Sequence, residues 1–140
     1  MIKKELNKFK LNAFYPNAAV LNYSVETGGR QMGIFDWMEA QVPGSVYSNL
    51  LRNGVIKDPF YDMNSMDWVP ERWWIYRTDF HIEKKANRHY RLNCQGIDYK
   101  SSIYLNDVKL GTSENMHVPF KAIIDGRLQE NNLLEIQLEN

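Results

Sequence analysis

The clearest alternation of apolar and polar positions runs through residues 67–82, read as DWVPERWWIYRTDFHI. Successive side chains of a β-strand point to opposite faces of the sheet, so a two-residue period predicts a strand with one buried face. One parity carries Trp74, Tyr76, Thr78, Phe80 and Ile82, and the other carries Arg77, Asp79 and His81. Because aromatic side chains bury large apolar areas, we expect this strand to anchor the core.

The same alternation, interrupted by turn residues, predicts more short strands along the chain. They cover residues 20–27, 37–42, 89–95, 102–105, 108–110, 118–124 and 134–138. Asn106 and Asp107 both tolerate positive φ and predict a two-residue hairpin turn. A brief helix is expected over residues 46–53, with Ser45 as N-cap and Gly54 just past its end.

These elements predict an all-β fold, a jelly-roll β-sandwich with one short helix. Residues 1–18 are expected to be a polar lead-in, and residues 19–140 to form the jelly-roll domain. The length of 140 residues suits one domain, and the aromatic share of 13% favours sheet over helix.

Charge and hydropathy narrow the classes of partner. Lys and Arg together equal Asp and Glu in number, so no basic surface is expected for nucleic acid or for an anionic membrane. No apolar run approaches the roughly 18 residues of a membrane span. Residues 1–10 carry four lysines, but asparagines and a proline break the region that follows, unlike a signal peptide. The expected location is therefore cytoplasmic, whether the chain stands alone or is a segment of a longer protein.

Candidate catalytic and metal-binding residues are few. Cys94 is the only cysteine, the three histidines are scattered, and no His/Cys set has zinc-ligand spacing. Carboxylates gather ahead of the central strand, at Asp58, Asp62, Asp67 and Glu71. Such a run is more often a set of solvated turn residues than a catalytic pair. We expect no cofactor; a structural Ca²⁺ held by carboxylate and backbone oxygens stays open, because sequence motifs do not reveal such ligands.

Three segments together resemble one family of enzymes. They are VPGSVYSNLLRNGVIKDPFYDMN, then RWWIYRTDF, then GIDYKSSIYLNDVKLGTSENMHVPF, which begin at residues 42, 72 and 96. In this order and spacing they are similar to the N-terminal domain of glycoside hydrolase family 2, and most similar to its β-mannosidase branch, from about residue 37 to residue 138. The resemblance implies a galactose-binding-like jelly roll that precedes an immunoglobulin-like domain and a (β/α)8 barrel.

The resemblance also implies a function and shows which domain of the parent enzyme would carry the catalytic residues. The parent enzyme would hydrolyse terminal β-mannosides with retention, and both catalytic carboxylates would come from the barrel, so no catalytic residue is expected in this chain. Asn64 and Trp68 are the residues expected at the edge of the sugar pocket, with Asp58 holding their loop by turn hydrogen bonds. Ser65 stands where the family commonly has an acidic residue, so β-galactosidase and β-glucuronidase activities also stay open.

Two alternatives do not require a parent glycosidase. A stand-alone carbohydrate-binding module would present an exposed aromatic platform, for which Tyr61, Trp68 and Trp73 are the candidates. A purely structural packing domain would instead expose an apolar patch as the footprint of partner domains.

Overall fold

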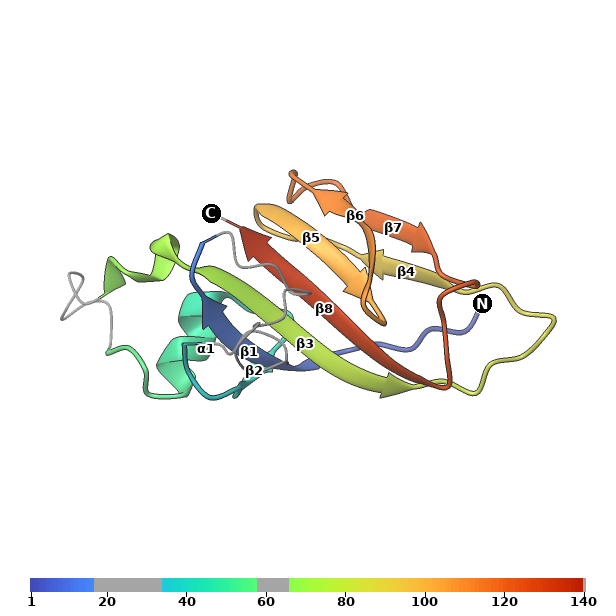
Figure 1. The fold of residues 1–140 in the computed structure, drawn as a ribbon, viewed down its shortest axis with the longest axis horizontal. Helices are drawn as coiled ribbons and strands as arrows, with labels where there is room; N and C mark the ends of the chain where they lie inside the picture. The colour runs from blue at the N-terminus through green and yellow to red at the C-terminus, as the bar shows by residue number, and fades with distance from the viewer. Residues whose placement is uncertain (17–33, 58–65, 140) are drawn as a thin grey trace, which may run out of the picture.

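The computed structural model describes residues 1–16, 34–57 and 66–139. Within them the chain folds into two antiparallel sheets and one short α-helix (Figure 1). The larger sheet has the strand order β2-β1-β3-β8-β5-β6, and the smaller one pairs β4 with β7. The elements are β1 Lys8–Phe14, β2 Met38–Gln41, α1 Val46–Arg52, the 3₁₀ turn η2 Val69–Glu71, β3 Trp73–His81, β4 Arg91–Cys94, β5 Lys100–Leu105, β6 Val108–Ser113, β7 Phe120–Ile123 and β8 Asn131–Glu139. The predicted all-β sandwich is confirmed.

The core lies between the two sheets, on the face of β3 that the alternation predicts. Trp74 and Tyr76 are buried there, and Phe80 packs against the same cluster. Strand β8 runs antiparallel to β3 along its length, as Figure 1 shows, and contributes Leu134 to the core opposite Thr78. Apolar side chains of β4 and β7 cover this face from the other side, including Leu92, Cys94, Phe120 and Ala122.

Helix α1 forms where its capping residues predict. Ser45 accepts a hydrogen bond from the Ser48 backbone N–H, and the Ser48 hydroxyl oxygen accepts one from the Ser45 N–H, which together make a capping box. Asn49, which is 1% exposed, accepts from the Gln41 N–H and donates to the Tyr76 hydroxyl. The helix is thereby fastened to β2 and β3, and Gly54 follows it with the left-handed φ of 72°.

The opposite face of the large sheet is less solvated than the alternation predicts. Ile75 lies there in a second apolar cluster with Phe14 and Tyr104. Glu135 is 2% exposed, and its carboxylate pairs with the Arg77 guanidinium at 3.3 Å. A buried carboxylate needs such a partner, so this ion pair explains how a charged residue occupies an inner strand.

Two predictions about the first part of the chain need comment. Residues 8–14, expected within a polar lead-in, form β1, which lies between β2 and β3 in the large sheet. The sequence KFKLNAF alternates polar and apolar residues as far as Ala13, so a strand signal is present there and the assignment of this segment to a lead-in was wrong. The strand predicted over residues 20–27 lies outside the described residues.

The predicted hairpin turn is confirmed. Asn106 and Asp107 have φ of 50° and 68° and join β5 to β6. Two successive residues with positive φ are the signature of a type I′ turn, whose twist matches that of the strands it connects. The turn places the Asn106 side chain next to the beginning of β8, where it accepts from the Leu133 N–H at 2.8 Å.

Candidate functional site

The residues that sequence analysis singled out for sugar binding are only partly placed by the structure. Asn64 and Asp58 lie outside the described residues. Trp68 immediately precedes η2, is half-buried, and packs in tilted geometry against Phe35 and Trp74 at ring-centre distances of 5.7 and 5.9 Å. Its indole therefore supports the core edge, and its role at a sugar pocket stays a prediction.

The carboxylates next to Trp68 show no paired arrangement in the part that is described. Asp67 and Glu71 are exposed, and the Glu71 carboxylate lies 4.0 Å from the Arg72 guanidinium. Asp58 and Asp62 fall in the undescribed segment. The geometry of the described residues thus gives no local pair of the kind that a glycosidase requires.

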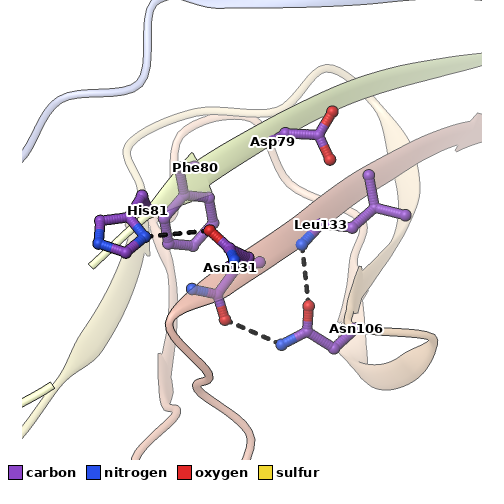
Figure 2. Close-up of a pocket in the computed structure, with 7 residues that line it drawn as sticks. Asp79, Phe80, His81, Asn106, Asn131 and Leu133 are labelled. Carbon is purple, nitrogen blue, oxygen red and sulfur yellow. Dashed lines mark hydrogen bonds between the residues drawn. The ribbon is translucent and has the colours of Figure 1, made fainter. Parts of the chain in front are cut away.

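A shallow hollow opens instead at the end of the large sheet where β3 ends and β8 begins (Figure 2). Cross-strand pairing puts Asp79 opposite Leu133 and His81 opposite Asn131 on one face. The residues that line the hollow are Asp79, Phe80, His81, Asn106, Asn131, Asn132 and Leu133. Asn106 was predicted only as a turn residue, and the strand pairing that brings Asn131 close to Asp79 was not visible in the chain order.

Two asparagine amides hold the wall of this hollow in place. The Asn106 side chain donates to the Arg127 carbonyl and to the Asn132 amide oxygen, each at 2.9 Å. Asn132, which is 3% exposed, also accepts from the Gln129 N–H and donates to the Gln129 carbonyl. Buried amides with satisfied hydrogen bonds are rigid, so Asn132 holds this part of the wall in place.

The remaining chemically distinctive groups serve the framework. Burial raises the pKa of the Cys94 thiol to about 11, so the thiolate needed of a nucleophile is scarce near neutrality. His89 lies 2.9 Å from the Asp125 carboxylate at the base of the β4 and β7 pair. Within the described ranges, no group of three or more His, Cys, Asp or Glu side chains is placed to hold a metal ion. Those same residues include no helix with the length and apolar character needed to cross a membrane.

Comparison with known proteins fixes the family. Residues 23–140 match the model of the glycosyl hydrolase 2 galactose-binding domain-like family. The chain belongs to this family. The expected galactose-binding-like fold is thereby confirmed, together with the resemblance to glycoside hydrolase family 2.

Among relatives of this galactose-binding-like domain, β-mannosidases are prominent. The β-mannosidase of Bos taurus is 27% identical over 123 residues, which are 85% of this chain and 14% of that protein. The crystal structure of the β-D-mannosidase from Dictyoglomus thermophilum has a TM-score of 0.78 and 30% identity, and the match covers 96% of this chain and 15% of that one. The chain therefore spans about one-seventh of the length of these relatives.

A more distant structure shares the fold of the domain. A β-glucuronidase from an uncultured Clostridium sp. has a TM-score of 0.65 and 20% identity, with 98% of this chain and 22% of that one covered. At that identity the likeness concerns the fold alone. Within the family, the mannosidase branch expected from the motifs is the better supported one.

Proposed function

We propose that the chain serves as the non-catalytic N-terminal jelly-roll domain of a retaining glycoside hydrolase that releases terminal β-mannosides. The observation that carries this proposal is the match to β-mannosidases, which extends over most of this chain and over about one-seventh of theirs. The relatives thus carry most of their length in other parts, and there we place the catalytic barrel.

The carboxylates of the described sheet support a non-catalytic role. Retaining glycosidases place two carboxyl groups about 5–5.5 Å apart, one as nucleophile and one as acid/base. Glu135 is engaged by Arg77, and the Glu139 carboxylate accepts from Ser102 and lies 3.6 Å from the Lys100 ammonium. Asp125 is held by His89. These groups stabilise the sheet and the hairpins, so we assign hydrolysis to the barrel.

In the proposed enzyme the domain packs against the barrel and forms the wall of the sugar pocket on its non-reducing side. Asn64 and Trp68 would line that wall, with Asp58 holding the loop. The packing of Trp68 against Trp74 favours this arrangement, because it holds the Trp68 indole against the core and so gives it a defined position.

The test is hydrolysis by the complete product of the gene that encodes this chain. We expect release of nitrophenol from a nitrophenyl β-mannoside with retention of configuration, and little from the β-galactoside or β-glucuronide. The isolated 140-residue chain should release none. Trp68→Ala in the complete product should raise KM, while Tyr47→Ala, at an exposed position of α1, should leave it unchanged. Hydrolysis by the isolated chain, or a preference for the glucuronide, would contradict the proposal.

A further inference from the structure

Helix α1 is followed directly by Asn53 and Gly54, the only asparagine–glycine pair in the sequence. Both residues are exposed, and the space where a side chain would stand at Gly54 is open. Because glycine has no side chain, its backbone nitrogen can approach the side-chain carbonyl carbon of the preceding residue with little steric hindrance. This pair is therefore the position where an asparagine side chain of the chain reacts most easily with the amide that follows it.

The reaction between these two groups consumes water alone. Hydroxide removes the proton of the Gly54 N–H, and the nitrogen attacks Cγ of Asn53. The bond from Cγ to Nδ2 then breaks, ammonia leaves with a proton taken from water, and a succinimide ring remains. Water opens this ring at either of its carbonyl carbons, which gives aspartate or isoaspartate. Nothing is oxidised or reduced, and an amide has become a carboxyl group that is ionised near neutrality.

The fold holds both reacting groups in hydrogen bonds. The Gly54 N–H donates to the Leu51 carbonyl at 3.1 Å. The Asn53 amide nitrogen donates to the carbonyls of Glu39 and Asn49, each at 2.8 Å. Attack therefore requires the end of the helix to open, as helix ends do when they fray. The folded chain reacts through this open form, and unfolding removes the protection.

The side chain of Asn53 also fastens α1 to an edge of the large sheet. Strand β2 is the outermost strand on one side of that sheet. Asn53 donates to the Glu39 carbonyl, and Asn49, one helical turn earlier, accepts from the Gln41 N–H at 2.9 Å. The two side-chain amides thus occupy positions along β2 that a neighbouring strand would otherwise fill.

A carboxylate at position 53 cannot make these contacts. It has no proton to donate, so the carbonyls of Glu39 and Asn49 would face a negative charge instead of an N–H. The charge would also lie at the C-terminal end of the helix, where the helix dipole disfavours it. We propose that Asn53 is a site of spontaneous deamidation and that its conversion detaches the end of α1 from β2. The inference goes beyond the proposed function and does not depend on it.

The chemistry is tested by incubation of the full chain in mildly alkaline buffer, either folded or unfolded in urea, followed by peptide mapping with mass spectrometry. We expect Asn53 to gain the mass difference between an amide and a carboxyl group in both samples. Conversion should be about tenfold or more slower in the folded chain, because its hydrogen bonds must open first. In urea, Gly54→Ala should slow the conversion, since a β-carbon hinders the attack and folding has no influence there. The proposal is overturned if Asn53 keeps its amide in either sample, or if Gly54→Ala reacts as fast as the parent chain.

The structural consequence is tested with Asn53→Asp, which carries the charged product in every molecule. This variant should unfold at a lower urea concentration than the parent chain. Its Gln41 amide should exchange hydrogen about tenfold faster, because the turn that carries the acceptor Asn49 is no longer fastened to β2. The matched control is Asn87→Asp, the same change at an exposed turn residue between β3 and β4, which should alter neither value. Parent-like stability and parent-like Gln41 exchange in Asn53→Asp would show that α1 stays attached and would overturn the proposal.

Discussion

Trp74 provides a quantitative test of the core assignment. The residue is 4% exposed, and its indole N–H donates to the Val69 carbonyl at 3.0 Å. Truncation of a buried aromatic to alanine costs about 3–5 kcal/mol through lost burial and the cavity that remains. Trp74→Ala also leaves the Val69 carbonyl without its donor, which puts the expected loss at the upper end of that range. A domain whose stability lies at the lower end of the usual range of about 5–15 kcal/mol would then be close to unfolded.

A second substitution separates the contributions of ring packing and of the hydrogen bond to the stability lost in Trp74→Ala. Trp74→Phe keeps most of the ring packing and removes the hydrogen bond, so it should cost about 1–2 kcal/mol. Urea unfolding followed by far-ultraviolet circular dichroism measures both variants, since this signal does not depend on the removed fluorophore. The midpoint should fall in the order parent, Trp74→Phe, Trp74→Ala, with an unchanged denaturant slope.

Trp68→Ala is the matched control for these measurements. Trp68 is half-buried and contacts the same cluster, so its truncation should cost about 1–2 kcal/mol. The reasoning is refuted if Trp74→Ala unfolds at the parent's urea concentration, or if Trp68→Ala is as unstable as Trp74→Ala. Either result would mean that the buried face of β3 has been assigned wrongly.

Three further predictions concern the thiol, one surface carboxylate and the end of the helix. The pKa of about 11 predicts that Cys94 reacts slowly with Ellman's reagent at pH 8 and rapidly once urea unfolds the chain; equal rates would contradict its burial. The His89 side chain, followed by the Tyr90 N–H, lowers the pKa of Asp125 below its ordinary value of 3.8. A depressed acid contributes stability above its unfolded pKa and loses it as pH falls through the folded one, so Asp125→Asn should flatten the fall in Tm below about pH 4. Gly54→Ala should lower the free energy of unfolding by about 1–2 kcal/mol, because φ is 72° at this position, although no atom lies within 4 Å of the added methyl group. Gly126 is equally uncrowded and has no positive φ, so Gly126→Ala should be neutral or slightly stabilising in the same urea assay.

Local patterns were sufficient to predict the elements whose sequences carry strong signals. The alternation through Trp74, Tyr76 and Phe80 identified β3 and its buried face, since a period of two has one interpretation over so many residues. Ser45 and Gly54 located α1, because each satisfies a backbone requirement at one end of a helix. Such signals are confined to a few neighbouring residues and do not depend on the rest of the fold.

Features set by contacts across the sheet could not be predicted in the same way. Glu135 alternates with the apolar residues of the last strand, and its burial depends on Arg77, which lies on β3. The hollow was missed for a related reason. Asp79 and Asn131 are far apart in the chain, and they become neighbours only when β3 pairs with β8. Strand order is a property of the whole fold, so chain order alone did not reveal it.

The position of β1 between β2 and β3 affects how the chain folds and how far it can be truncated at its N-terminus. Its partner β3 begins at residue 73, and the next neighbour, β8, begins at residue 131. The central strands of the large sheet therefore pair only when almost the entire chain is present. Pairing between segments so distant in sequence makes folding slow. A truncated version that starts after Phe14 would leave one side of β3 with bare amides and carbonyls, an edge that invites aggregation.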